Sequence, residues 1–305
     1  MRPRRTLSPT DEYSAAAAKG TITTARTREA RGARWIRALV LIAAPIATAP
    51  VLPAAGPAGW TLDFDHAKPG PVTEEAIRSL SPAPVQWAGG FATAGDAGRF
   101  TIVESAGHGR ALRVLYPKGG VGPGQTGGQW MADLPPRDTY ELEYRVRFGA
   151  DFDWVQGGKM PGLGGGTAPT GGHFDADGFT SRYMWREGGR LVVYLYWAGQ
   201  GSASKSTGRQ YGVDLDCGVT MERDRDYLLR QRVTLNTPGK ADGVLEVWVN
   251  GAPALRRGDL LFRDAPGKGW QIDRFFFSTF HGGNDASWAP ARDCAVEFDD
   301  FTVRP

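Results

Sequence analysis

The chain has 305 residues, of which 41% are hydrophobic and 23% charged, so it can bury a sizeable core and is not disordered over most of its length. The formal net charge of +3 is unevenly spread: residues 1–55 carry nine Lys or Arg and three acids, whereas the remainder carries more acids than bases. A nucleic-acid-binding domain keeps its positive charge in the folded part, so this class is disfavoured. The 42 Gly and 21 Pro follow no collagen-like period and favour short strands joined by turns over a helical bundle.

The sequence over residues 1–55 predicts a leader for export. Its apolar run, Ala38–Val51, follows three arginines and is followed by small residues. A basic region, an apolar region and a small-residue end are the parts of a secretory signal peptide. The run is short and contains two prolines, so it is a poor membrane span, although an uncleaved anchor is the alternative. We therefore expect a signal peptide or disordered leader over 1–55 and a secreted, monomeric domain over 56–305, with no stable membrane insertion after cleavage.

Two cysteines, Cys217 and Cys294, lie in the part expected to be exported. An even number of cysteines in an oxidising compartment predicts one disulfide, here closing a long loop. Two free buried thiols are the alternative. No partnered base lies near either cysteine in the sequence, so a thiol nucleophile is not expected.

From Trp60 onward, alternating segments predict strands. In Tyr140–Phe148, aromatic and aliphatic residues alternate with Glu and Arg, which indicates a strand with one buried and one exposed face. Asn250-Gly251 predicts a tight hairpin turn, and the one expected helix is Glu74–Leu80, capped by Thr73. Eight or more antiparallel strands in one domain predict an all-β sandwich or barrel. The other strands are expected over Ala111–Tyr116, Phe179–Trp185, Leu191–Trp197, Tyr227–Leu235, Val244–Val249, Arg274–Phe280 and Val296–Val303.

Several common catalytic arrangements are missing from the sequence. It contains no phosphate-binding loop and no GxSxG nucleophile motif. Glu141 and Glu143 alternate as a glycosidase pair would, but Arg145 and Arg147 share their face, which favours a cross-strand charge ladder. The four histidines lack the close spacing of a zinc site; they are His66, His108, His173 and His281.

The most informative part of the sequence is a pair of alternating strands joined by a turn at 187–190. Thr180 and Arg182 are two residues apart, so they share one face of the first strand. Tyr194 and Tyr196 likewise share one face of the second strand. Because the turn makes the strands antiparallel neighbours, Arg182 and the two tyrosines are expected to line one sheet face.

These residue types fit β-elimination on a uronic acid better than hydrolysis. The reaction removes the C5 proton, which is α to a carboxylate, and expels the O4 oxygen. Arg182 and the glycine-flanked Lys159 can stabilise the charge that builds on the carboxylate. A tyrosine whose pKa is lowered by nearby cations can serve as acid or base, and a desolvated Lys159 is an alternative base. A polymer substrate needs a long open groove, so among all-β folds we favour the β-jelly-roll sandwich of concanavalin A type, whose concave sheet supplies one.

Three motifs resemble the polysaccharide lyase 14 family, the alginate and glucuronan lyases with a β-jelly-roll fold. They are GGKMPGLGGG (Gly157–Gly166), TSRYMWR (Thr180–Arg186) and YLYW (Tyr194–Trp197), and the resemblance extends over Trp60–Pro305. It implies a metal-independent lyase that cleaves a uronic-acid polymer. The family's lysine, Ser/Thr-x-Arg and Tyr-x-Tyr positions fall on Lys159, on Thr180 and Arg182, and on Tyr194 and Tyr196. Thr180 stands for the commoner serine and Met160 for leucine, and the loop Gly164–Gly172, which does not align, is expected to set substrate choice.

Six further residues are candidates to hold sugar rings or carboxylates: Gln129, His173, Thr180, Trp185, Arg186 and Trp197. No cofactor and no catalytic metal are expected. A structural Ca²⁺ is conceivable if the two ends of the domain pair, because Asp63, Asp65, Asp299 and Asp300 lie there. Charged strand-edge positions are the alternative for these four residues.

Two other functions stay open at this stage. The first is a non-catalytic, lectin-like carbohydrate-binding module, which would keep its affinity when the tyrosines are replaced by Phe. The second is a glycoside hydrolase, which needs a carboxylate pair that the sequence does not offer. Each site residue also has an ordinary interpretation: Lys159 as a solvated loop lysine, Arg182 as a partner of Asp175 or Asp177, and the tyrosines as plain strand aromatics.

Overall fold

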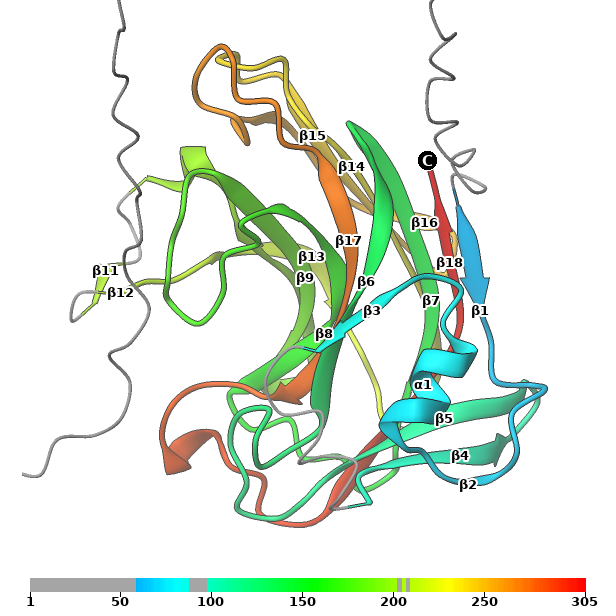
Figure 1. Cartoon of the computed structure of the whole chain (residues 1–305). Helices are drawn as coiled ribbons and strands as arrows, with labels where there is room; N and C mark the ends of the chain where they lie inside the picture. The colour runs from blue at the N-terminus through cyan, green and yellow to red at the C-terminus, as the bar shows by residue number, and fades with distance from the viewer. Residues whose placement is uncertain (1–58, 88–97, 202–204, 207–208) are drawn as a thin grey trace, which may run out of the picture. The chain divides into compact units, whose positions relative to one another are not determined.

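The structure, a computed structural model, describes residues 59–87, 98–201, 205–206 and 209–305, and the predicted leader lies outside them. Two antiparallel sheets pack face to face (Figure 1). The predicted all-β jelly-roll sandwich is confirmed. Among the described residues, no helix combines the length and the apolar character that crossing a bilayer requires.

The first sheet has nine strands. Its order is β16 (Ala252–Leu260), β15 (Gly243–Val249), β14 (Asp226–Thr234), β7 (Thr139–Phe148), β18 (Cys294–Arg304), β5 (Gly109–Tyr116), β4 (Phe100–Ser105) and β2 (Gly70–Pro71), with β1 (Trp60–Leu62) beside β18.

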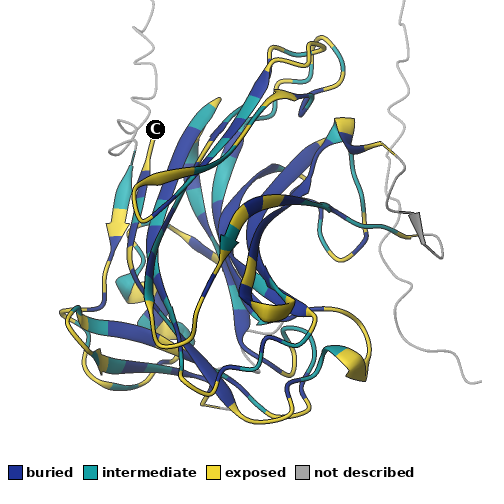
Figure 2. Cartoon of the chain, turned by 180° about the vertical axis from the view of Figure 1, so that it is seen from behind, coloured by how far each residue is buried: buried dark blue, intermediate teal, exposed yellow. Residues whose placement is uncertain are grey.

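The second sheet, called the concave sheet below, has seven strands and is strongly curved (Figure 2). Its order is β13 (Val213–Thr220), β10 (Arg190–Tyr196), β9 (Gly178–Arg186), β8 (Gly157–Gly166), β17 (Ile272–His281), β6 (Gly128–Arg137) and β3 (Val85–Trp87). A short hairpin, β11 (Lys205–Ser206) and β12 (Arg209–Gln210), lies outside both sheets. Within the described ranges, the helices are α1 (Glu74–Leu80) and three 3₁₀ turns, Glu187–Gly189, Ala198–Gln200 and Ala286–Trp288.

The core lies between the sheets and is rich in aromatic side chains. Tyr144 of the first sheet packs edge-on against Tyr183 of the second, with ring centroids 6.1 Å apart, and Phe148 packs against Trp185 at 5.7 Å. Each such ring removes a large apolar area from water, and the edge-on geometry adds a favourable quadrupole interaction. These contacts pack the inner face of the concave sheet against the nine-stranded sheet.

The local sequence signals for helix and turn are confirmed. Helix α1 spans the predicted residues, and the Thr73 hydroxyl accepts a hydrogen bond of 3.2 Å from the Ala76 amide. Asn250 and Gly251 both have positive φ, 51° and 80°, and they join β15 to β16 in a two-residue hairpin loop. The eight predicted strands are also present, with ends shifted by a residue or two.

One segment differs from its expected form. Residues Gly157–Gly166, which are not among the strands expected above, form strand β8 in the middle of the concave sheet. A Cβ on Gly162 would overlap the Ser181 carbonyl of β9, and one on Gly158 would overlap the Phe280 carbonyl of β17. The glycines therefore let β8 lie tightly between its neighbours. Strand propensity does not predict this role, because it disfavours glycine in strands.

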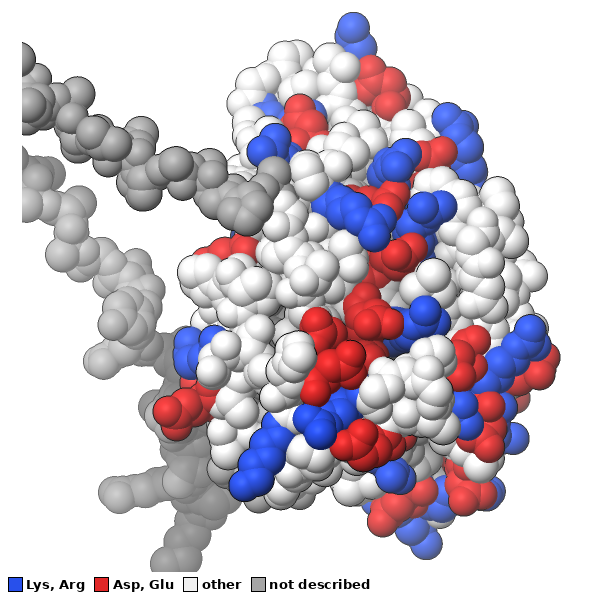
Figure 3. Space-filling model, turned by 90° about the vertical axis from the view of Figure 1, so that its right-hand side faces the viewer, with Lys and Arg blue, Asp and Glu red and all other residues white. Residues whose placement is uncertain are grey.

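The outward face of the nine-stranded sheet carries the predicted charge ladder. Glu141 on β7 accepts hydrogen bonds from Arg232 on β14 (2.9 Å) and from Arg304 on β18 (3.1 Å). Arg304 also reaches Glu143, at 3.4 Å. Figure 3 shows acidic and basic side chains interspersed on the side of the molecule where β1 and β18 lie. These glutamates are engaged by arginines and do not form a glycosidase pair.

The predicted disulfide is wrong. Cys217 and Cys294 are both free and buried. Cys217 lies on β13 of one sheet and Cys294 on β18 of the other. Both side chains pack in the hydrophobic core. Burial in these apolar surroundings raises the pKa of the Cys217 thiol to about 12 and that of Cys294 to about 11, which keeps both thiols protonated and unreactive.

Candidate active site

A groove of about 610 Å³ lies on the concave sheet. Strand alternation decides which side chains reach it. On β9, Arg182 and Met184 face the groove, while Tyr183 and Trp185 belong to the core between the sheets. On β10, Tyr194 and Tyr196 face the groove, and Tyr194 is the direct cross-strand partner of Arg182.

Arg182 lies at the base of this groove and is 2% exposed. Its Nη1 donates to the Ser278 hydroxyl at 3.2 Å, whereas Nε and Nη2 have no hydrogen-bond partner among the described residues. Burial lowers the Arg182 pKa to about 10, so the guanidinium is still charged at neutral pH. A buried cation with free donors is a binding site for an anion. The alternative pairing with Asp175 or Asp177 is not found; Asp177 instead binds Lys268.

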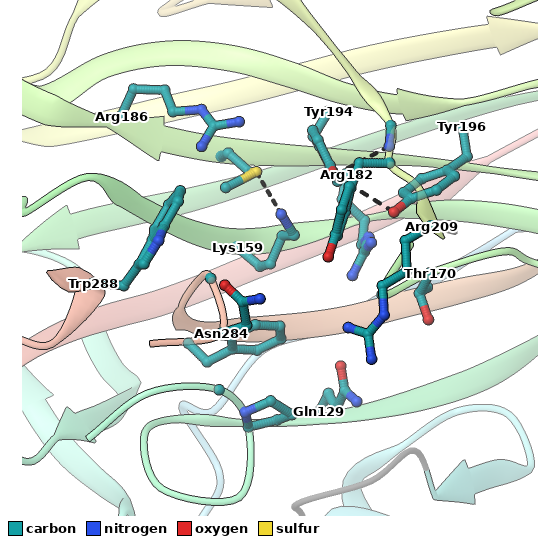
Figure 4. A pocket seen from close by; sticks show the side chains of 18 residues that line it. Gln129, Lys159, Thr170, Arg182, Arg186, Tyr194, Tyr196, Arg209, Asn284 and Trp288 are labelled. Atoms are coloured by element: carbon teal, nitrogen blue, oxygen red, sulfur yellow. Dashed lines mark hydrogen bonds between the residues drawn. The ribbon is translucent and has the colours of Figure 1, made fainter. Parts of the chain in front are cut away.

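Lys159 stands at an irregularity in β8. The register with β9 shifts between Lys159 and Gly162, and such a bulge re-aims a side chain. The Lys159 ammonium nitrogen lies 2.6 Å from Sδ of Met184 and 3.6 Å from the ring centroid of Tyr194 (Figure 4). Desolvation, strengthened by the charges of Arg182 and Arg186, holds the Lys159 pKa well below its usual value. A lowered pKa favours the neutral amine, which is the form that can accept a proton.

The two tyrosine hydroxyls lie next to each other, 3.4 Å apart. The Tyr194 hydroxyl accepts from the Gly212 amide at 3.1 Å, and the Tyr196 hydroxyl accepts from the Gly172 amide at 2.9 Å. Burial raises the Tyr194 pKa, and the neighbouring Tyr196 raises it further. The expectation that nearby cations lower the tyrosine pKa is therefore wrong for Tyr194, because desolvation outweighs the attraction of Arg182.

Two further predicted residues line the groove. Arg186 is held by Asp214 in a two-pronged ion pair, with contacts of 2.8 Å and 2.6 Å, so its charge is compensated within the protein. Gln129 accepts a hydrogen bond from Ser278 at 3.2 Å. Ser278 thereby links Gln129 to Arg182.

Four residues that were expected to contact sugar do not line the groove, and their contact with sugar stays a prediction. Trp185 is fully buried and donates its indole N–H to the Trp154 carbonyl at 3.1 Å, and Trp197, 8% exposed, also belongs to the core. Thr180 is buried and donates to the Pro169 carbonyl at 2.9 Å, which ties down the loop before β9. His173 is exposed on that loop and does not line the groove. In the two tryptophans, strand alternation turns the ring away from the groove face.

Sequence reasoning missed the residues that come to the groove from loops. They lie far apart in the chain and have no spacing that connects them, so only the fold brings them together. The clearest are Thr170, Arg209, Tyr211, Asn284 and Trp288. Met184 was visible as part of a motif, but its contact with Lys159 was not predicted.

The charges of the groove have one sign. Four cationic side chains line it, and among the described lining residues there is no Asp or Glu. The cations are Lys159, Arg182, Arg186 and Arg209. Such a site favours an anionic ligand.

Two of the aspartates considered for a structural Ca²⁺ have other partners in the structure. The end strands β1 and β18 do pair, but Asp65 accepts from the Arg110 amide at 2.9 Å and Asp300 pairs with Arg145 at 2.7 Å. Across the part of the chain that the structure describes, no group of three or more His, Cys, Asp or Glu side chains is placed to hold a metal ion. Calcium binding at the domain ends stays a prediction.

A jelly-roll sandwich with an open groove on its concave sheet can hold an extended ligand, but proteins of several functions share this fold. A family model described as polysaccharide lyase 14 matches residues 104–301. The chain belongs to this family and is a polysaccharide lyase. A search of curated protein sequences gave no match.

Solved structures share the fold. Alginate lyase Aly36B is 24% identical with a TM-score of 0.67, and the alignment covers 82% of this chain and 97% of that one. The marine PL-14 alginate lyase from Aplysia kurodai is also 24% identical with a TM-score of 0.67, over 80% of this chain and 98% of that one. Alginate lyase vAL-1 from Chlorella virus is 22% identical with a TM-score of 0.55, over 67% of this chain and 88% of that one.

Proposed function

We propose that this lyase cleaves a polyuronate, with alginate as the first substrate to test, by β-elimination in the concave groove. The observation that carries the proposal is the buried Arg182, whose Nε and Nη2 face no protein acceptor while the described groove lining offers no acid. A uronate carboxylate supplies the missing acceptors and the missing negative charge.

In the proposed reaction, Arg182 binds the C5 carboxylate and stabilises the charge that develops on it as the C5 proton leaves. The Lys159 amine takes this proton, because its lowered pKa makes the neutral form available. The C4–O4 bond breaks, a C4–C5 double bond forms, and the Tyr194 hydroxyl donates its proton to the departing O4. The raised Tyr194 pKa keeps this hydroxyl protonated before the step. The ammonium of Lys159 then returns a proton to Tyr194, which restores the starting state.

Tyr196 and Gln129 complete the arrangement as positioning groups. The Tyr196 hydroxyl lies 3.4 Å from the Tyr194 hydroxyl and holds it in place on the groove side of β10. Gln129 and Ser278 fix Nη1 of Arg182, while Nε and Nη2 have no hydrogen-bond partner among the described residues. We assign no step to His173, Thr180, Trp185 or Trp197.

The choice of alginate draws on the solved structures. A variant of Aly36B with one lysine and one tyrosine changed to alanine is known in complex with an alginate tetrasaccharide, and it is 24% identical to this chain with a TM-score of 0.67. A lysine-and-methionine variant is known with an alginate trisaccharide. Glucuronan, which has the same carboxylate next to C5, is the alternative polymer. We also propose that the protein is exported, on the sequence of residues 1–55.

The test is to incubate the protein with mannuronate-rich alginate, guluronate-rich alginate and glucuronan and to follow the ultraviolet absorbance of the unsaturated product. Lys159→Ala and Tyr194→Phe should bind the polymer but lose at least about a thousandfold in kcat. New reducing ends without absorbance would indicate hydrolysis instead. Binding by the wild type without any product would indicate a carbohydrate-binding module.

A further inference from the structure

We infer that Arg209 binds the carboxylate of a second, neighbouring uronic acid, so that efficient cleavage requires two consecutive uronates. This inference rests on the proposed function and concerns the specificity of the same groove.

Two of the four groove cations are already accounted for. Arg186 is neutralised by Asp214 at 2.6–2.8 Å. Lys159 contacts a thioether and an aromatic ring, an environment that favours the uncharged amine. Arg182 is left for the carboxylate of the reacting sugar. The remaining cation, Arg209, has no ion pair and no side-chain hydrogen bond with any residue that the structure describes.

Arg209 is held at one end of the groove by its surroundings. Its aliphatic stem packs over Gly172, where an added Cβ would lie 3.0 Å from Cβ and 3.1 Å from Cδ of Arg209. The next residue, Gln210, donates its amide to the Gly172 carbonyl at 3.0 Å. The Gly172 amide in turn donates to the Tyr196 hydroxyl at 2.9 Å. The strand residue next to Arg209 is thus connected through two hydrogen bonds to Tyr196, whose hydroxyl lies beside that of Tyr194.

The view into the groove places Arg209 beside the reacting groups. Figure 4 shows its guanidinium on the side of Tyr196 and Thr170, away from Trp288 and Arg186, which lie at the other end. A sugar chain lying along the groove with one carboxylate on Arg182 therefore brings a neighbouring sugar next to Arg209. A planar, always charged guanidinium suits a carboxylate in two-pronged geometry, whereas a neutral sugar offers it only hydroxyl groups.

The consequence is a requirement on the polymer. In a homopolymer of uronic acids every sugar supplies a carboxylate, and both arginines are engaged at once. In a polymer where uronic acids alternate with neutral sugars, Arg209 meets no charge. The structure therefore assigns the enzyme to blocks of consecutive uronic acids, and Arg209 is the residue that distinguishes them.

The experiment uses alginate whose carboxyl groups have been reduced at random to primary alcohols, to graded extents. If cleavage needs one uronate, the initial rate falls in proportion to the remaining uronate fraction; if it needs two neighbours, the rate falls with the square of that fraction. At half reduction we expect about a quarter of the starting rate for the wild type and about half for Arg209→Gln, each relative to its own rate on intact polymer. On intact polymer, Arg209→Gln should lower kcat/KM by about tenfold, and less at high salt because Arg209 is exposed.

Arg256→Gln is the matched control. Arg256 is exposed on β16 of the other sheet, so this change removes the same charge away from the groove and should keep the quadratic dependence. A wild-type rate that is linear in uronate fraction, or an Arg209→Gln variant as quadratic as the wild type, would overturn the inference while leaving the lyase activity in place. Absence of unsaturated product from all intact polymers would overturn the proposed function and the inference together.

Discussion

Replacing Arg182 by Met should abolish catalysis and make the protein more stable. Arg182 is 2% exposed, has one hydrogen bond of 3.2 Å, and keeps two nitrogens without partners among the described residues. Burial lowers its pKa from 12.5 to about 10, which corresponds to about 3 kcal/mol of cost for the charged form in the folded state. Because the pKa values of both states lie above pH 7, this cost is fully present at neutral pH and declines only as the pH rises through the folded value.

Met fills a similar volume without the charge, and Ser278 keeps its hydrogen bond to Gln129. Allowing about 1 kcal/mol for the lost Arg182–Ser278 bond, we expect the free energy of unfolding to rise by about 1–3 kcal/mol. For a domain of this size that is about 2–4 °C in Tm for each kcal/mol. Loss of the group that stabilises the developing charge should lower kcat by about a thousandfold or more.

The matched control is Arg263→Met. Arg263 is also buried, at 5% exposure, but its guanidinium is satisfied: it donates to Asp138 at 3.0 Å and to the Asn236 carbonyl at 3.2 Å. Removing it leaves these acceptors without their donor, so we expect a loss of about 3 kcal/mol in unfolding free energy with little effect on kcat. Urea unfolding at pH 7 measures both variants. If Arg182→Met destabilises the fold as much as Arg263→Met does, the reasoning from unpaired donors is refuted.

Three further predictions concern the base, the core and the thiols. kcat/KM should rise with pH through the pKa of Lys159, and Arg186→Gln should move this rise to higher pH, because it removes a cation that lowers that pKa; a pH–rate profile that does not move would contradict this. Trp185→Phe should lower the free energy of unfolding by about 1–2 kcal/mol, because the indole hydrogen bond and side-chain volume are lost. KM should be unchanged in steady-state assays; a raised KM would indicate that the tryptophan contacts sugar. Tm measured by calorimetry should be the same with and without a thiol reductant, since Cys217 and Cys294 are unpaired; a drop with reductant would reveal a disulfide.

The all-β class was predictable because strand periodicity is a local property. In Tyr140–Phe148 every second residue is apolar, and all of these residues are buried in the structure, as is Glu141 beneath its arginine partners. Strand β8 escaped prediction because its glycines are selected by the close approach of β9 and β17, which is a contact between distant segments. The strands β4, β6, β13 and β16 carry weaker alternation and were also not predicted individually.

In the candidate site, strand logic worked where a motif lay on neighbouring strands. Arg182 and Tyr194 are cross-strand partners, as the turn at 187–190 implied. Trp185 and Trp197 do not line the groove, because the alternation that places Arg182 in the groove places these two rings in the core. The loop residue Arg209 carries no periodic signal, so no local pattern could have connected it to the groove.

Unpartnered buried atoms do not by themselves mark a functional site in this protein. Arg99 and Asp299 also have buried side-chain atoms without partners among the described residues, yet neither lines the groove. Arg182 differs from them because it lines the same groove as an amine of lowered pKa, Lys159, and a phenol of raised pKa, Tyr194. Opposite shifts in two adjacent groups are what proton removal at one atom and proton donation at the next require. In the charge ladder on the other sheet, Glu141 is paired with Arg232 and Arg304, which stabilises the fold. It offers no proton acceptor beside a proton donor.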